Sequence, residues 1–236
     1  MGTIEQLRDR LSRELSRLPS QYRLMLLSIA VGIVAGLGAI LFDRLLGWML
    51  RNVLEAFTGY AEPRAGAPAA SLFTFAPARS LWFFIIPALG GLVSGVIVYL
   101  VAPEAEGHGT DAMIEAFHLR GGKIRKRVPF VKILASALTI GTGGSAGKEG
   151  PIAQIGSGFG STFASLLKLN ARERRILVLA GAAGGIGAIF QAPLGAALFA
   201  HYNTAFPARR GTEVAVTGST RNRLGGASRP SGPRLG

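Results

Sequence analysis

The sequence contains no cysteine, only three histidines and few charged residues (17%). Without cysteine, the chain can form neither a disulfide framework nor a cysteine metal site. Charged residues make up about 25% of an ordinary soluble domain, so this composition is better interpreted as that of a membrane protein. Acidic residues are the scarcer kind, 13 against 26 Lys and Arg. The basic residues gather in short segments that flank apolar runs, so we expect no nucleic-acid partner.

Three regions of different composition divide the chain. Leucines at helical spacing alternate with arginines over residues 1–23, which predicts a cytoplasmic amphipathic helix rather than a cleavable signal peptide. Residues 24–200 hold a series of apolar segments and form the predicted membrane domain. Residues 201–236 are rich in Gly, Pro, Ser, Thr and Arg, the composition of a disordered tail. One hypothesis is that this tail lies out of the natural reading frame.

Two apolar segments are long enough to cross a bilayer core, which needs about 20 residues. They cover residues 24–50 and 81–101, and Gly32 with Gly36 forms a small-residue face suited to helix packing. Two basic clusters follow later in the chain. The positive-inside rule places both clusters, together with the arginine-rich N-terminus, in the cytoplasm. The clusters consist of Arg120, Lys123, Arg125, Lys126 and Arg127, and of Lys168, Arg172, Arg174 and Arg175.

The apolar segments between the two basic clusters are too short to cross the membrane one after the other. Residues 129–140 and 152–167 are joined by a glycine-rich break. If both clusters lie on one side, the chain enters and leaves the membrane between them, and the break lies at membrane depth. Irregular backbone is tolerated there only where protein or a water-filled cavity surrounds it, and many transporters build ion sites from such broken helices.

The break ends in Gly147-Lys148-Glu149-Gly150-Pro151. Ionisable residues between apolar segments indicate a functional site in a membrane chain. Proline is favoured at the first position of a helix, so Glu149 is expected at the mouth of a helix whose free amide groups attract anions. The alternative is that Glu149 only caps and stabilises this helix.

Lys148 either neutralises a helix end or pairs with an acidic residue such as Asp43 or Asp111, and the sequence leaves this choice open. A P-loop is excluded, because Glu149 follows the lysine and Thr142 occupies the position of the first glycine. A Rossmann fingerprint forced onto the break lacks the later acidic residue. A metal site is the weaker interpretation of four polar residues that we expect at a surface, His108, Asp111, Glu115 and His118.

The motif Gly147 to Pro151, followed by Gln154-Ile155-Gly156, resembles the second signature of the CLC family of chloride channels and chloride/proton exchangers. Residues 181–199 resemble the stretch two helices later. Residues 107–111, Gly-His-Gly-Thr-Asp, fall where the family has its first signature, typically G-S-G-I-P. The resemblance covers residues 23–200, the first of the two inverted halves of that fold.

This resemblance implies an all-α integral membrane fold, a CLC-type bundle of tilted and broken helices. It implies chloride transport by a channel or a proton-coupled exchanger, with Glu149 as the gate that occupies the anion site when deprotonated. The expected partners are chloride, protons and the lipid bilayer, with homodimers in the intact parent protein, no cofactor and no enzymatic activity. The expected location is a bacterial inner membrane with a cytoplasmic N-terminus. The implied anion-binding residues are His108, Gly109, Thr110, Gly147, Lys148, Gly150 and Pro151.

The chain also departs from the family pattern. The serine that donates its hydroxyl to the ion corresponds to His108, so the resemblance leaves selectivity and pH response open. The proton-transfer glutamate of exchangers falls near Asn203, and the second half of the fold is not found. We therefore expect a chain that is incomplete for transport. The rival interpretations are a non-transporting membrane fragment or assembly partner, and a soluble protein that binds anions or nucleotides.

Overall fold

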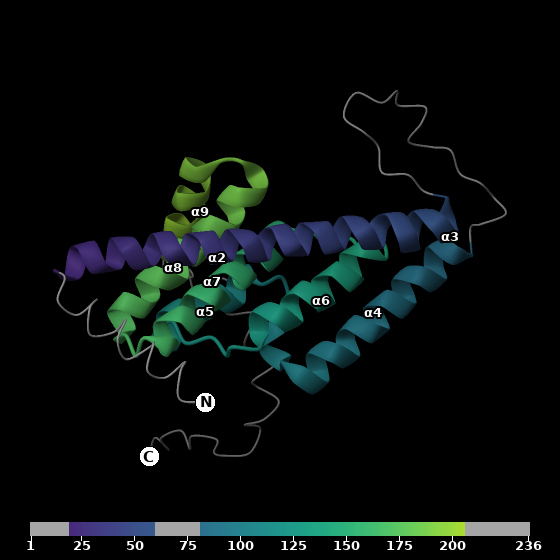
Figure 1. Ribbon diagram of the computed structural model, residues 1–236. Helices are drawn as coiled ribbons and strands as arrows, with labels where there is room; N and C mark the ends of the chain where they lie inside the picture. The colour runs from purple at the N-terminus through teal and green to yellow at the C-terminus, as the bar shows by residue number, and fades with distance from the viewer. Residues whose placement is uncertain (1–18, 60–80, 206–236) are drawn as a thin grey trace, which may run out of the picture. The chain divides into compact units, whose positions relative to one another are not determined.

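Every regular element in the described part of the chain is helical (Figure 1). The computed structural model describes residues 19–59 and 81–205. The chain divides into two compact units, Met1–Thr204 and Ala205–Gly236, and the packing described below lies within the first. The elements are α2 (Ser20–Met49), a π-helix (Leu50–Glu55), α3 (Ala56–Thr58), α4 (Trp82–Val101), a 3-10 turn (Pro103–Ala105), α5 (Thr110–Leu119), α6 (Val128–Gly141), α7 (Glu149–Leu166), α8 (Ala171–Phe190) and α9 (Pro193–Ala205).

Two helices in the described ranges are long and apolar enough to cross a membrane, Ser20–Thr58 and Trp82–Val101. Only 33% and 17% of their most apolar windows are buried. Large apolar side chains are exposed on both, among them Leu37 on α2 and Phe84 on α4. An apolar surface of this extent is unfavourable in water and suits contact with lipid. Both predicted spans are thus present as helices.

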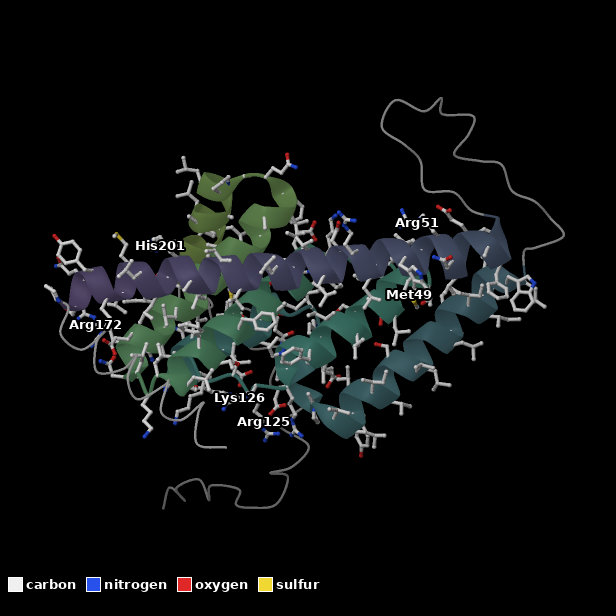
Figure 2. All side chains as sticks on the ribbon, in the orientation of Figure 1. Met49, Arg51, Arg125, Lys126, Arg172 and His201 are labelled. Carbon is white, nitrogen blue, oxygen red and sulfur yellow. The ribbon has the colours of Figure 1, made fainter. Side chains whose placement is uncertain are left out.

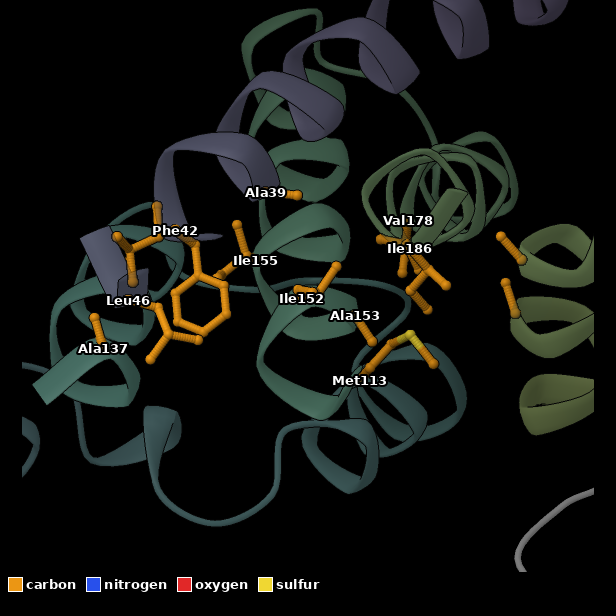
Figure 3. Packing of buried hydrophobic residues seen from close by; sticks show 14 residues of the cluster. Ala39, Phe42, Leu46, Met113, Ala137, Ile152, Ala153, Ile155, Val178 and Ile186 are labelled. Carbon is orange, nitrogen blue, oxygen red and sulfur yellow. The ribbon is translucent and has the colours of Figure 1, made fainter. Parts of the chain in front are cut away.

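The buried centre of the unit is α7. Every residue from Gly150 to Gly158 on this helix is buried. Figure 3 shows Ile152 and Ile155 of α7 beside Phe42 of α2 and Val178 of α8, all of which belong to one apolar cluster. Helices α2, α6 and α8 contact α7, and α4 contacts α6 on the outside of the bundle.

Glycines let the central helices touch backbone to backbone. Gly156 and Gly160 of α7 lie directly against carbonyl groups of α8, so that a methyl group at either glycine would overlap them. On α2, Gly32 contacts Gly184 and Gly36 faces Ala188, both on α8. Membrane helices lack a hydrophobic driving force for association and depend on such close packing. The predicted small-residue face on α2 is therefore an interface with α8.

The two basic clusters lie side by side. The end of α5 and the loop before α6 both pack on the start of α8, where Arg175 Nε donates to the carbonyl of Phe117 in α5 at 2.7 Å and Gly122 of the loop faces Arg174. The Ser161 hydroxyl of α7 donates to the carbonyl of Gly122 at 2.7 Å. Figure 2 marks Arg125 and Lys126 in this loop and Arg172 near the start of α8. This arrangement agrees with the sequence argument, because α6 begins beside one basic cluster and α7 ends beside the other.

Several boundaries differ from those drawn on the sequence. Helix α2 begins at Ser20, so residues 20–23 continue into the first span, and the rest of the predicted N-terminal helix, residues 1–18, lies outside the described residues. Helix α9 continues to Ala205, past the predicted domain boundary at residue 200. Residues 206–236 of the predicted tail, and residues 60–80 of the predicted loop, also lie outside the described part.

Candidate functional site

The N-termini of α5 and α7 meet in van der Waals contact. A methyl group added at Gly150 would overlap the carbonyl oxygen and the imidazole ring of His108. Gly109, at a positive φ of 106°, lies so close that its methyl group would be 2.6 Å from the Gly150 carbonyl oxygen. Only glycine fits these two positions, because of the close approach at both and the backbone conformation at Gly109. The motifs at residues 107–111 and 147–151 are thus in direct contact in the structure.

Neither of these two N-termini is capped by a side chain. The first intrahelical bonds are Met113 N to Gly109 O in α5 and Ile152 N to Lys148 O in α7, both 3.1 Å. The preceding N–H groups of each helix therefore lack an intrahelical acceptor. Helix α8 is different, because Asn170 and Glu173 form a complete capping box there.

Pro151 is the third residue of α7 and not the first, which corrects the expectation from the sequence. The physical reason is that all the N–H groups of a first turn lack intrahelical partners, so proline removes no bond at the third position either. Glu149 is the first residue, as predicted for a residue at the mouth of the helix.

The Glu149 carboxylate is exposed and folds back over Gly147, where a side chain would collide with it. It has no hydrogen bond or ion pair with any other described residue. It therefore does not cap α7 in this conformation, contrary to the alternative raised from the sequence. A carboxylate without fixed partners is free to change position.

Lys148 pairs with Asp43 and not with Asp111. Its Nζ lies 2.9 Å from Asp43 Oδ1, with both side chains partly exposed, and 5.9 Å from the ring centroid of Phe190. The choice that the sequence left open is settled in favour of the α2 residue. The pair ties the start of α7 to α2, and the predicted role of Lys148 as an anion ligand stays a prediction.

Lys132 is a site residue that the sequence analysis missed. It belongs to the apolar helix α6, and only 3% of its surface is exposed. Its ammonium group donates to the carbonyls of Ala105 (3.0 Å) and Gly107 (2.6 Å), next to the start of α5. No acidic side chain pairs with it in the described part of the chain. A lone lysine within an apolar segment was the available signal, because such residues are costly in a membrane and mark functional sites.

A cavity of about 470 Å³ opens between α4, α6 and the two N-termini. Lys132 and three predicted site residues, His108, Gly147 and Pro151, line it. Of the other predicted residues, Gly109 and Gly150 pack behind this lining, and Thr110 Oγ1 lies 3.4 Å from His108 Nδ1. The cavity also carries hydroxyl groups of α4 and α6, from Ser94, Ser136 and Thr139.

The fold is a helical bundle with two helices long and apolar enough to cross a membrane. Uncapped helix N-termini and a buried ammonium group adjoin its cavity, and both kinds of group attract anions. Comparison with known proteins gives the family. The family described as "Voltage gated chloride channel" matches residues 90–206. The chain belongs to the CLC family of chloride channels and H⁺/Cl⁻ exchangers, which are transporters and not enzymes.

Curated relatives include the "H(+)/Cl(-) exchange transporter ClcA" of Yersinia pseudotuberculosis serotype IB (strain PB1/+), 32% identical over 203 residues, which are 84% of this chain and 39% of that protein. The protein of the same name from Salmonella paratyphi B is 31% identical over 196 residues, 81% of this chain and 38% of that one. The crystal structure of a slow cyanobacterial Cl⁻/H⁺ antiporter superimposes with a TM-score of 0.53 and 26% identity, covering 73% of this chain and 38% of that one. The chain thus spans well under half the length of these relatives.

Proposed function

We propose that this chain binds chloride at the paired N-termini of α5 and α7 and forms part of a chloride pathway gated by Glu149. The observation that carries the proposal is that two uncapped helix N-termini meet beside a cavity with a buried ammonium group. Each N-terminus carries the equivalent of about half a positive charge, and its free N–H groups are ready donors to an anion.

Glu149 acts as the gate because its carboxylate and a chloride ion compete for the same amide donors. The carboxylate is at the first position of α7 and has no other partner among the described residues. When it takes up a proton, its attraction to the N-terminus falls and the anion gains the donors. Anion occupancy and proton uptake are then linked, as in any site where one ligand excludes another.

Lys132 supports the site in two ways. Its positive charge lies at the cavity wall, where the surrounding protein weakens screening by water. Its bonds to the carbonyls of Ala105 and Gly107 also direct the negative ends of these dipoles toward the ammonium group and away from an anion.

The relatives named above are H⁺/Cl⁻ exchange transporters, and this supports chloride as the ion and protons as the second ligand. We further propose a bacterial inner membrane location with both basic clusters in the cytoplasm. The intact parent protein is proposed to be a homodimer.

The test is chloride binding and chloride flux by the purified 236-residue chain. Isothermal titration calorimetry in detergent measures binding, and a chloride electrode measures release from liposomes loaded with KCl after valinomycin is added. We expect saturable binding of chloride and none of gluconate. Absence of binding contradicts the proposal. Binding without flux favours the rival interpretation, a fragment or assembly partner that does not transport by itself, and extraction from membranes by high salt alone favours a soluble protein.

A further inference from the structure

We infer that the side chain of His108 is a proton-dependent ligand for the anion, so that the chain binds chloride more tightly when this imidazole is protonated. The inference rests on the proposed function, because it assigns a ligand and a pH response to that same cavity. It concerns a residue that replaces the serine of the family pattern.

His108 is exposed at the cavity, with its backbone and ring against Gly150. It immediately precedes Gly109, the N-cap of α5, and it lines the cavity together with Lys132. Its Nδ1 lies against Gly150 and 3.4 Å from the Thr110 hydroxyl. Its Nε2 has no hydrogen-bond partner among the described residues.

The chemistry of imidazole makes this position sensitive to protons. A neutral ring has one donor and one acceptor, and the acceptor repels an anion. A protonated ring has two donors and a full positive charge, and histidine is the side chain that ordinarily changes charge between about pH 5 and 8. An anion in the cavity stabilises the charged ring, and by linkage the charged ring stabilises the anion.

Charged groups around His108 act in both directions. Lys132 of α6 lines the same cavity and opposes a second positive charge there unless an anion is bound between them. Carboxylates favour protonation of His108 but compete with the anion. Of these carboxylates, Glu106 lines the cavity with His108, and Asp111 and Glu149 lie in the first turns of α5 and α7. The remaining nearby cation, Lys148, is paired with Asp43.

Protonation of either His108 or Glu149 would favour anion binding, so the test must distinguish the two groups. Glu149→Gln removes the titration of the proposed gate, and chloride affinity is then measured by calorimetry at pH 5.5 and 7.0, where Lys132 keeps its charge, at constant ionic strength with sodium gluconate. We expect chloride to bind about tenfold more tightly at pH 5.5. A tenfold change in affinity corresponds to a shift of one pH unit in the titration of the group that is linked to binding. Adding His108→Ser is expected to remove this difference and to retain binding. His201→Ser, at an exposed position on α9, is the matched control and is expected to keep the difference.

A second measurement needs no change at His108. In ¹⁵N-histidine spectra of the chain, His108 is one of three signals, and chloride is expected to move its titration midpoint to higher pH while His201 does not move. A full pH difference in the His108→Ser version, or an unmoved midpoint, overturns the inference and leaves the proposed function standing. Absence of chloride binding in every version at both pH values overturns the proposed function and the inference with it.

Discussion

At the scale of single residues, the proposed anion site includes a carboxylate that the fold does not immobilise. Glu149 begins α7, yet it neither caps the helix nor pairs with a described residue, whereas the neighbouring Lys148 is held by Asp43. The contrast between these adjacent residues has a physical meaning. The lysine anchors the start of the helix, and the glutamate keeps the freedom of movement that the proposed exchange with an ion requires.

Replacing the Glu149 carboxylate is the direct test of its proposed competition with chloride. Glu149→Gln keeps the shape of the side chain and removes its charge, so chloride no longer competes with an anion tethered at the same amides. Interactions of a charge with a helix N-terminus are worth about 0.3–2 kcal/mol, so we expect chloride affinity at pH 7.5 to rise about 2- to 30-fold by calorimetry. Glu115→Gln, whose carboxylate pairs with Arg120 in solvent, is the control and is expected to change nothing. Equal affinities of Glu149→Gln and the unaltered chain would contradict the competition.

Gly150 tests the contact between the two motifs. Gly150→Ala places a methyl group on the His108 carbonyl and ring, so the two N-termini must separate. Overpacking of this kind costs about 1–3 kcal/mol, and we expect a lower thermal midpoint by circular dichroism together with weaker chloride binding. Gly47→Ala on α2 is the control, because it lies outside the cavity lining, its methyl group meets no atom within 4 Å and alanine favours a helix. A Gly150→Ala chain as stable and as tight-binding as Gly47→Ala would contradict the assignment.

The sequence predicted that Glu149 lies at the start of a helix but did not place Lys132 beside it, and the reason is physical. A glycine break followed by proline specifies a local structure, the start of a helix, so Glu149 could be placed from its neighbours in the chain. The role of Lys132 depends on carbonyls of the loop at residues 105–107, which approach α6 only in the folded unit. Contacts between segments, such as Gly150 on His108, are likewise not encoded in local spacing.

At the scale of elements, apolar periodicity and glycine breaks predicted the helices well and their ends less well. Helix α4 agrees with the predicted span to within one residue, because the apolar run ends sharply at both sides. Helices α2 and α9 extend beyond their predicted limits at Ser20 and Ala205, where polar residues continue a helix whose apolar face has already ended. Helical hydrogen bonds do not require apolar side chains, so composition alone misplaces such ends.

The packing of α7 on α8 gives a prediction for this scale. Gly160→Ala sets a methyl group against the Leu177 carbonyl, and the two helices must move apart along a backbone contact. We expect a lower thermal midpoint, by a loss of about 1–3 kcal/mol, with little change in chloride affinity, because Gly160 lies about three turns from the N-terminus of α7. Gly47→Ala on α2 points into open space and serves as the control. A loss of chloride affinity without a loss of stability would contradict this division of roles.

At the scale of the whole molecule, the helix that begins with α2 is long enough to reach from one side of the proposed membrane to the other. Arg23 near its start pairs with Glu173 beside the second basic cluster. Arg51 lies 28 residues further along a continuous helix, about 40 Å away at 1.5 Å per residue, which exceeds a hydrocarbon core of about 30 Å. Arg51 and the basic clusters should therefore face opposite solutions.

Labelling in intact cells tests this topology, and the absence of cysteine in the chain makes single-cysteine versions simple to prepare. We expect an impermeant maleimide to modify Arg51→Cys in intact bacteria and to modify Lys126→Cys and Arg172→Cys only after lysis. All three positions are exposed, so access to the reagent is limited by the membrane alone (Figure 2). Labelling of Lys126→Cys and Arg172→Cys from different sides would contradict the shared location of the basic clusters.

The uneven capping of the helices has a consequence for folding. The chain closes the start of α8 with its own Asn170 and Glu173, and it leaves the starts of α5 and α7 open. A bound halide then acts as a capping group supplied by the solution, and it stabilises the native state by mass action as any ligand of that state does. The ion that the protein is proposed to conduct would thus also be a structural component, and the folded unit would be least stable in a medium free of halide.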